Sequence, residues 1–540
     1  MTILTINKKR FEKDIGKLND KMQEDIALFG TPIERISESE LDIELFPNRP
    51  DLLSYENYKH SFLSYLGKGT GLRKIEIKPS GYKMVVEKSL PKEWPYAFSC
   101  IVRGLKFDGN KIREIIDLQE KLGLTLLRKR KKGGIGLYPL QKIEFPVTFK
   151  GVDPNQIKFR PLEFPSEITG KQVLSKHPTG RKYAHLVDGW GKFPVFVDAK
   201  GAIMSMPPII NSHDVGKIDE TTKEVFIECT GTDSNVLKKV MNIIVASLER
   251  MGGKVYSIEC VQQNGKKELI PDLASDKIKI SLERVNKFLG LDLKDKEIKK
   301  FLERLGHDYN NGVVSVSPFR VDVLHEVDLI EDIAIAYGYD KFVPEIPKIS
   351  TIGKINPRET LKRKIAEIFS GLGMLETISY HLVSKDTIKR FEENPKEYVK
   401  VENSKTEHEF LRKDLASYLM KIYSENVDVE YPHEIFQIGR IFDGFHEKEH
   451  LAVAMTPGNF TKLKQALDYF SRMLDVRLEV KESNEIPEYF IEGRVAKILF
   501  NNKFVGFLGE VHPKVIQNFK LKMPVALFEI DLDEILNQSL

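Results

Sequence analysis

The sequence has little cysteine. Its three cysteines, Cys100, Cys229 and Cys260, form no CxxC pair. This excludes a paired-cysteine zinc site and a disulfide framework of the kind found in small secreted domains. No apolar run approaches the roughly 18 residues of a membrane span. The first residues contain no apolar core of signal-peptide length. We therefore expect a cytoplasmic protein with no membrane segment.

The chain also lacks a strong excess of either charge. It has 83 Lys and Arg against 79 Asp and Glu, a net charge of +4. This balance neither requires nor excludes a nucleic-acid partner, because a local basic surface is enough to bind RNA. A length of 540 residues is too great for one core, so we predict roughly three or four domains.

Carboxylates are grouped in the stretch from Pro318 to Asp340. Asp328, Glu331 and Asp332 have the spacing i, i+3, i+4, so a helix would place them on one face. Asp322 lies just before that helix, at the end of a predicted strand. Oxygen ligands of this kind suit a hard cation such as Mg²⁺. The alternative is that acidic residues favour the first turn of a helix because of its dipole.

The same stretch resembles a segment of the phenylalanyl-tRNA synthetase β-subunit family, Arg-x-Asp…Asp-Leu-Ile-Glu-Glu/Asp-x-Ala-x-x-Tyr-Gly-Tyr. The matching residues are Arg320, Asp322, Asp328, Glu331, Asp332, Ala334 and Tyr337-Gly338-Tyr339. In that family the four carboxylates hold a Mg²⁺ ion that is shared with the α subunit. The resemblance therefore implies a metal site formed by Asp322, Asp328, Glu331 and Asp332.

The resemblance continues in order along the chain and implies an α+β multidomain fold. An N-terminal domain (1–85) contains Asn48-Arg49-Pro50-Asp51, and a mixed α/β tRNA editing domain follows (86–262). A winged-helix-like module (276–345) carries the acidic residues. The last domain (346–540) resembles a class II synthetase antiparallel-sheet domain that lacks the catalytic motifs. Ser212 and the shortness of the chain at both ends imply the archaeal or eukaryotic type.

Periodicity predicts the local elements. The apolar spacing predicts helices over residues 8–21, 55–66 and 360–372. Gly290 and Gly306 are expected to close two further helices. Alternation predicts strands over residues 378–382, 398–401 and 435–441. A linker is expected over residues 263–275.

The editing domain has a defined chemical purpose. Tyrosine is phenylalanine plus one hydroxyl, which an apolar pocket rejects by only about 10²-fold, so a separate hydrolytic site is useful. We expect Glu228 to accept the phenol hydrogen bond, and Asn211, Ser212 and Thr230 to orient the tRNA 3′ end and a water. Alternatives are a salt bridge for Glu228 and a core position for Thr230. No Cys/His or Ser/His pair is evident, which favours hydrolysis by a positioned water. Tyr138-Pro139 replaces the family's His-Asp pair.

The activation chemistry is expected to lie in another chain. Class II activation needs one arginine in its second motif and another after a glycine-rich strand, to neutralise phosphates. The last domain has Arg412 and Arg440 but no such glycine motif. We therefore expect ATP and phenylalanine to bind the α subunit, and this chain to edit and to help hold tRNA(Phe) in an α₂β₂ phenylalanine–tRNA ligase. Alternatives are a free-standing aminoacyl-tRNA deacylase and a non-catalytic tRNA-binding scaffold.

Overall fold

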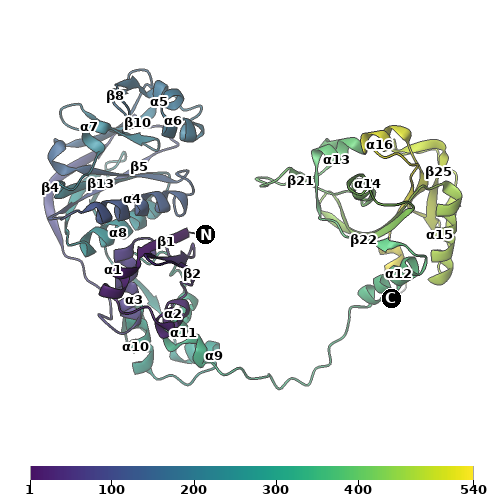
Figure 1. Ribbon diagram of the computed structural model, residues 1–540, viewed down its shortest axis with the longest axis horizontal. Coiled ribbons are helices and arrows are strands. Elements are labelled where there is room, and N and C mark those ends of the chain that lie inside the picture. Colours follow the sequence, from purple (N-terminus) through teal and green to yellow (C-terminus); the bar gives the residue numbers. More distant parts are fainter. Residues whose placement is uncertain (1, 539–540) are drawn as a thin grey trace. The chain divides into compact units, whose positions relative to one another are not determined.

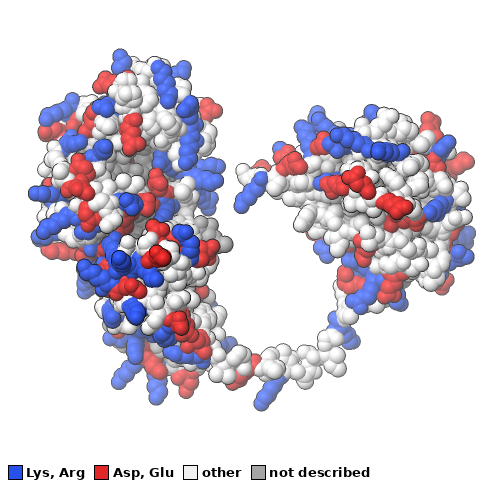
Figure 2. Space-filling model, in the orientation of Figure 1, with Lys and Arg blue, Asp and Glu red and all other residues white. Residues whose placement is uncertain are grey.

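The computed structural model describes residues 2–538. Two compact units make up the chain, Met1–Ile346 and Pro347–Leu540 (Figure 1). Basic and acidic side chains are interspersed over the visible surface of each unit (Figure 2), as the near balance of charge leads one to expect. None of the helices within residues 2–538 has both the length and the apolarity needed to cross a bilayer.

The first unit begins with a three-stranded antiparallel sheet of order β1-β3-β2 and three helices. The elements are β1 (Thr2–Asn7), α1 (Lys8–Asp14), α2 (Asp20–Leu28), β2 (Ile33–Ile36), β3 (Glu40–Leu45) and α3 (Tyr55–Tyr65). The single helix predicted over residues 8–21 is wrong. Gly16, with a φ of +150°, interrupts it, and Asn19 caps α2 by accepting a hydrogen bond from the Met22 N–H. The prediction over residues 55–66 is confirmed as α3.

A sheet of ten strands follows in the first unit. Its order is β12-β11-β10-β7-β4-β14-β5-β13-β6, with β15 paired to β14 off this path. The strands are β4 (Ile77–Val86), β5 (Tyr96–Arg103), β6 (Gly133–Pro139), β7 (Val147–Val152), β10 (Phe193–Val197), β11 (Ile203–Met206), β12 (Ile210–Asn211), β13 (Glu224–Gly231), β14 (Lys254–Val261) and β15 (Lys267–Ile270). Helix α8 (Ser234–Arg250) packs on β5 and β13 and contacts α4 (Gly109–Leu124).

Pairing in this sheet changes two expectations. Strand β4 starts at Ile77 and pairs with β14 and β7, so the sheet begins before residue 85, the predicted end of the N-terminal domain. Strand β15 pairs antiparallel with β14, so part of the predicted linker over residues 263–275 is the second arm of a hairpin. Short elements complete this region: β8 (Lys158–Phe159), β9 (Ile168–Thr169), α5 (Gly170–Lys176), α6 (Pro178–Tyr183) and α7 (His213–Gly216).

The first unit ends with three helices and a three-stranded sheet of order β16-β18-β17. The elements are β16 (Asp276–Lys279), α9 (Leu282–Leu289), α10 (Asp295–Arg304), β17 (Asp308–Asn310), β18 (Val313–Val316) and α11 (Glu326–Tyr337). Gly290 caps α9 in the left-handed conformation at φ +67°, as predicted. The apolar faces of the helices, including Val285, Ile298 and Leu329, meet in a buried core. Strand β18 ends six residues before Asp322, so the expectation that Asp322 ends a strand is wrong.

A seven-stranded sheet of order β19-β22-β23-β27-β26-β25-β24 forms the second unit. The strands are β19 (Leu375–Glu376), β22 (His433–Asp443), β23 (His446–Thr456), β24 (Leu478–Lys481), β25 (Phe490–Phe500), β26 (Lys503–Val511) and β27 (Ala526–Asp531). Alternate residues of β23 enter different cores. Leu451 and Val453 pack with α12 (Pro357–Gly371) and α15 (Phe460–Met473), whereas Ala452 packs with α14 (Ala416–Glu425) and α16 (Pro513–Asn518).

Two predicted strands of the second unit are wrong. Apolar residues alternate over 378–382, but Ile378 and Tyr380 are 90% and 88% exposed. No strand of the described chain pairs with them, and only Leu382 belongs to a strand. Residues 398–401 form a single isolated bridge, between Lys400 and Phe410. The strand over 435–441 is confirmed within β22.

The remaining elements are β20 (Leu382–Ser384), α13 (Lys385–Arg390), β21 (His408–Leu411) and α17 (Asp533–Gln538).

Candidate functional site

Strand pairing places Glu228 and Thr230 opposite two glycines. In the antiparallel pair β13–β6, Glu228 lies opposite Gly136 and Thr230 lies opposite Gly134. Residues two apart on a strand point to the same face. The side chains of Glu228 and Thr230 therefore lie on one face of the sheet, and the two residues opposite them on β6 are glycines, which have no side chain. A Cβ at Gly136 would overlap the Tyr138 hydroxyl and Glu228 Oε1. Gly136 therefore leaves the room that the Tyr138 hydroxyl and the Glu228 carboxyl occupy.

Glu228 is 2% exposed and has no cation beside it. The Tyr138 hydroxyl donates to its Oε1 at 2.9 Å, and the Ser205 hydroxyl donates to the same oxygen at 3.4 Å. The other oxygen, Oε2, is buried without a hydrogen-bond partner. The salt bridge considered from the sequence does not occur, because Glu228 is in none of the ion pairs of the described residues.

Burial sets the protonation of Glu228. Removal from water disfavours the charged form and raises the pKa of Glu228 to about 8, although the hydrogen bonds from Tyr138 and Ser205 oppose this shift. The side chain is therefore mainly a neutral carboxylic acid at pH 7. A neutral carboxyl group can both accept and donate a hydrogen bond, and its unpartnered oxygen is available to a ligand.

Glu228 lies at the wall of a cavity of about 430 Å³. Its apolar lining comes from α4, the turn after α4, β6 and the turn before β12: Ile116, Leu127, Ile135, Leu137, Pro207, Pro208 and Ile209. Polar and charged side chains line the rest, including Glu120, Arg130, Glu163 and Lys217. Small-molecule sites are concave and combine apolar surface with placed polar groups. Its size and lining suit an aromatic ring whose polar end reaches Glu228.

The other three predicted editing residues are placed differently from one another. Asn211 lines the cavity, and its Oδ1 lies 3.4 Å from the Tyr138 hydroxyl. Thr230 is fully buried, and its Oγ1 has no partner. Ser212 is not part of the lining: its hydroxyl caps α7 by accepting a hydrogen bond from the Asp214 N–H at 3.3 Å. The fold thus brings Glu228, Thr230 and Asn211 together and gives Ser212 a capping contact.

The acidic stretch forms α11 as predicted, but its carboxylates do not converge. Asp328 accepts hydrogen bonds from the N–H groups of Leu324 and His325, both at 2.8 Å, and so caps the N-terminus of α11. Glu331 is exposed on the surface of the helix. Asp332 is 2% exposed and points into the module.

Arg320 neutralises the two remaining carboxylates. It forms a fork with Asp322, with its Nε 2.9 Å from Oδ1 and its Nη2 2.7 Å from Oδ2, and it reaches Asp332 at 3.0 Å. His307 Nδ1 accepts the Ser317 N–H, so its Nε2 carries the proton and donates to Asp332 at 2.9 Å. Burial opposes ionisation of Asp332, but Arg320 and His307 outweigh it and hold the pKa of that carboxyl well below its usual range.

This arrangement does not fit a metal ion held by Asp322, Asp328, Glu331 and Asp332. Within residues 2–538, no three His, Cys, Asp or Glu side chains are grouped so that they could hold a metal ion. Asp322 and Asp332 are both already paired with the Arg320 guanidinium. The magnesium site that the resemblance implies stays a prediction.

The residues that hold Glu228 were not predicted from the sequence. Tyr138 was only a departure from a family pattern, and Ser205 was not considered. For Tyr138 the sequence did contain a signal: it is two residues from Gly136 in β6, and residues two apart on a strand share a face. The pairing partner of β6 was needed to see that this face meets Glu228.

Two family models match the chain. One describes the phenylalanyl tRNA synthetase beta chain CLM domain and matches residues 343–532. The other describes the tRNA synthetase B5 domain and matches residues 278–339, which contain the acidic stretch.

Several curated proteins are similar over almost their whole length. The phenylalanine–tRNA ligase beta subunit of Archaeoglobus fulgidus is 36% identical, covering 98% of each chain. That of Methanocaldococcus jannaschii is 35% identical, over 99% of this chain and all of the relative. Among solved structures, an N-terminal fragment of the phenylalanyl-tRNA synthetase beta subunit from Pyrococcus horikoshii matches with a TM-score of 0.60 and 31% identity, covering 62% of this chain and 99% of the fragment.

Asp332 is expected to stabilise the fold by an amount that depends on pH, and the variant Asp332→Asn tests this. Asp332→Asn should lower the free energy of unfolding of the first unit by about 3 kcal/mol at pH 7, because it removes one partner of a buried ion pair. The pKa of Asp332 is lowered in the fold, so its contribution is fully present above the unfolded pKa of about 4 and is lost as the pH falls. Urea unfolding at several pH values measures this.

Glu331→Gln is the matched control, since Glu331 is the exposed neighbour in sequence. We expect it to change stability by less than about 0.5 kcal/mol. A gap between wild type and Asp332→Asn that stays constant down to about pH 3 would contradict the ionised state of Asp332.

Proposed function

This chain belongs to the family of phenylalanine–tRNA ligase β subunits, and we propose that it shares the work of aminoacylation with an α subunit. In this proposal, an α₂β₂ complex in the cytoplasm joins phenylalanine to tRNA(Phe). The α subunit binds ATP and phenylalanine. This chain supports the complex, contacts the tRNA and hydrolyses Tyr-tRNA(Phe).

The contacts of two arginines support activation in the other subunit. Arg412 is 2% exposed, and it donates from Nε to the Arg440 carbonyl at 2.7 Å and from Nη1 to the Ser379 carbonyl at 3.1 Å. Arg440 pairs with Glu447 at 2.7 Å. A triphosphate needs cations that are free to neutralise it, and these two are engaged by the protein itself.

An exposed apolar segment suits the partner subunit. Leu375, Ile378 and Tyr380 are 68%, 90% and 88% exposed. They lie on and beside β19, the terminal strand of the seven-stranded sheet. Apolar side chains next to an unpaired sheet edge favour contact with another chain. We assign this segment to the α-subunit contact.

The pocket around Glu228 supports selective hydrolysis. A tyrosyl group placed in the apolar part of the cavity would bring its phenol hydroxyl toward the unpartnered Oε2 of Glu228. A phenylalanyl group would leave this buried oxygen without a partner, which costs about 1–3 kcal/mol. That unpartnered oxygen is the observation that carries the proposal.

A positioned water is the proposed nucleophile. Its oxygen attacks the ester carbonyl carbon, the bond from that carbon to the ribose 3′ oxygen breaks, and the 3′ oxygen leaves with a proton as a hydroxyl. We assign the orientation of the ester and the water to Asn211, which lines the cavity, and to Thr230, two residues from Glu228 on β13, whose Oγ1 has no partner. Cys229 is buried, and burial raises its pKa well above the usual thiol value, so it is poorly suited to attack.

The two alternative functions fit less well. A free-standing deacylase or a simple tRNA-binding scaffold does not need the residues that match the CLM domain. The match to whole β subunits, over 98% or more of this chain, favours a subunit of the ligase.

Replacement of Glu228 should separate editing from aminoacylation. We expect Glu228→Ala to slow hydrolysis of Tyr-tRNA(Phe) by about 10²-fold, because the hydroxyl loses its acceptor, while phenylalanine charging by the complex is unchanged. The assay is deacylation of preformed Tyr-tRNA(Phe) beside a charging assay. Glu93→Ala, at an exposed glutamate of the same unit, is the control. Unchanged hydrolysis in Glu228→Ala would refute the assignment.

The raised pKa of Glu228, about 8, predicts a pH dependence of selectivity. Above this pKa the carboxyl is ionised and accepts a stronger hydrogen bond from the phenol. The ratio of Tyr-tRNA(Phe) to Phe-tRNA(Phe) hydrolysis should therefore rise between about pH 6.5 and about pH 8.5. Glu228→Gln, which has no acid group, should show a flat ratio. Parallel profiles for the two proteins would count against Glu228.

Charges in the exposed segment should weaken assembly. The double variant Ile378→Glu/Tyr380→Glu is expected to reduce affinity for the α subunit by at least about thirtyfold, because large apolar side chains in an interface carry much of its binding energy. Analytical ultracentrifugation of mixed subunits measures this. Phe445→Glu, at a residue 86% exposed elsewhere in the same unit, is the control. Assembly at wild-type strength by the double variant would place the contact elsewhere.

A further inference from the structure

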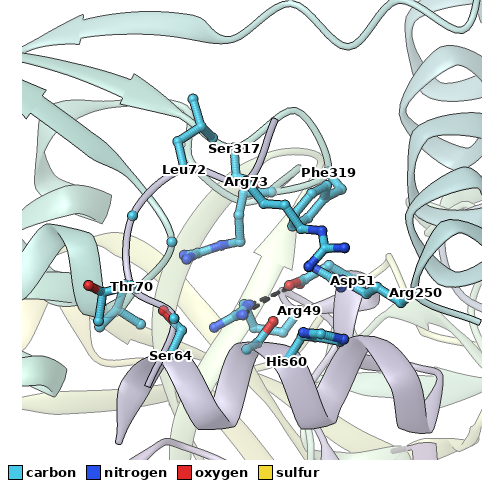
Figure 3. A pocket seen from close by; sticks show the side chains of 16 residues that line it. Arg49, Asp51, His60, Ser64, Thr70, Leu72, Arg73, Arg250, Ser317 and Phe319 are labelled. Atoms are coloured by element: carbon cyan, nitrogen blue, oxygen red, sulfur yellow. Dashed lines mark hydrogen bonds and ion pairs between the residues drawn. The ribbon is translucent and has the colours of Figure 1, made fainter. Parts of the chain in front are cut away.

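A second cavity lies in the first unit, apart from Glu228 and its neighbours. It has a volume of about 240 Å³ and is formed where several parts of the chain meet (Figure 3). Helix α3 and the turn before it supply one wall, and the loop of residues 69–73 supplies a second. The end of α8 and the turn after β18 complete it.

The loop that walls this cavity is fixed in place. Its Gly71 N–H donates to the Glu303 carbonyl at 2.7 Å, and the Leu72 N–H donates to Asp308 Oδ1 at 2.9 Å. The loop is rich in glycine, with Gly69 and Gly71 at positive φ. In the structure it closes one side of a pre-formed pocket.

The charged lining of the cavity is almost all of one sign. Four arginines, Arg49, Arg73, Arg250 and Arg320, face a single lining carboxylate, Asp51. On the face of the molecule that Figure 2 shows, by contrast, both signs are interspersed. Guanidinium groups in a concave site favour an anion to the extent that carboxylates do not already neutralise them.

Three of these arginines are already paired with carboxylates. Arg49 forms a fork with Asp51, both contacts being 2.9 Å. Arg73 pairs with Glu249 at 2.8 Å. Arg320 holds Asp322 and Asp332, as described above.

Arg250 is the exception among the four. No carboxylate of the described residues lies within ion-pair distance of it. Its Nη1 donates to Asn57 Oδ1 at 2.6 Å, and its guanidinium lies 4.9 Å from the centre of the Phe319 ring. Neither an amide nor an aromatic ring neutralises a cation, so the positive charge of Arg250 can still attract an anionic ligand.

Two buried donors of the lining have no partner. They are Nε of Arg250 and the hydroxyl of Ser317. Ser317 is 2% exposed, so bulk water does not satisfy it. Buried polar groups without partners are uncommon and costly. Two in one cavity indicate that something with acceptor oxygens belongs there.

His60, which also lines the cavity, carries no charge at pH 7. Burial, together with Arg250 and Arg73, lowers the pKa of His60 to about 4, so His60 is neutral at pH 7 and supplies a polar wall. Asp51, Glu249 and Glu56 are the acidic groups near Arg250, and each is engaged by another cation: Arg49, Arg73 and Arg10 respectively.

We propose that this pocket binds a small tetrahedral oxyanion of the phosphate class. Guanidinium groups match the geometry of phosphate oxygens and bind them through charge-assisted hydrogen bonds. The volume of about 240 Å³ is below the range of about 300–1,000 Å³ for drug-sized ligands. It suits inorganic phosphate or pyrophosphate better than a nucleotide. The anion bridges α8, the turn before α3 and the turn after β18.

Calorimetry on the full-length chain tests the proposal. The probes are inorganic phosphate and pyrophosphate, titrated at ionic strength matched with chloride. We expect saturable binding and a higher melting temperature with the anion, because a ligand that binds only the folded state stabilises it. Arg250→Gln should weaken binding by about tenfold or more, and Ser317→Ala by about threefold. Arg477→Gln, at an arginine 86% exposed in the second unit, should bind as wild type.

Circular dichroism without anion shows whether each variant is folded. If Arg250→Gln fails to fold, Ser317→Ala, which removes only one oxygen, carries the test. Absence of saturable binding to wild type, or equal affinity in wild type and the pocket variants, overturns the proposal. Arg250-dependent binding of a short RNA without phosphate binding also overturns it, in favour of an RNA contact.

Discussion

Burial of a carboxyl group inside a β-sheet is the constraint on which the candidate editing pocket depends. Glu228 lies in the middle of β13 with no cation beside it, so its charge is disfavoured and its oxygens need hydrogen-bond donors. Gly136 on β6 leaves space for those donors, and Tyr138 and Ser205 supply them to one oxygen. The second oxygen has no protein partner. In the proposed function, the phenol of a tyrosyl group is the partner that this oxygen lacks.

The first unit deals with buried carboxyl groups in two contrasting ways. Asp332 keeps its charge because Arg320 and His307 contact it directly, whereas Glu228 lacks a cation and keeps its proton. The two groups therefore differ chemically. The carboxylate of Asp332 is fully paired and holds its module together, whereas Glu228 has one oxygen without a partner. The arginines beside Asp51 show the reverse case, in which positive charge exceeds the acids that line the pocket.

Elements with a strong local signal were predictable from the sequence. Helix α3, the cap at Gly290 and the strand over residues 435–441 were predicted because periodicity and chain-ending residues act locally. The helix over 8–21 failed at Gly16, whose unusual backbone angle interrupts a favourable apolar pattern. The strand predicted over residues 378–382 was wrong because alternation of apolar residues does not show whether another strand pairs with the segment. Spacing put Asp328 and Asp332 on one helix, but it gave no weight to Arg320, whose position depends on the tertiary fold. The role of Tyr138 likewise required the register of β6 against β13.

The most direct test of selective recognition is a binding measurement that involves no chemistry. Non-hydrolysable 3′-amide analogues of tyrosyl- and phenylalanyl-adenosine can be titrated into the chain by calorimetry. If the unpartnered oxygen of Glu228 accepts the phenol hydroxyl, the tyrosyl analogue binds at least about tenfold more tightly than the phenylalanyl one. Equal affinities for the two analogues would contradict the account.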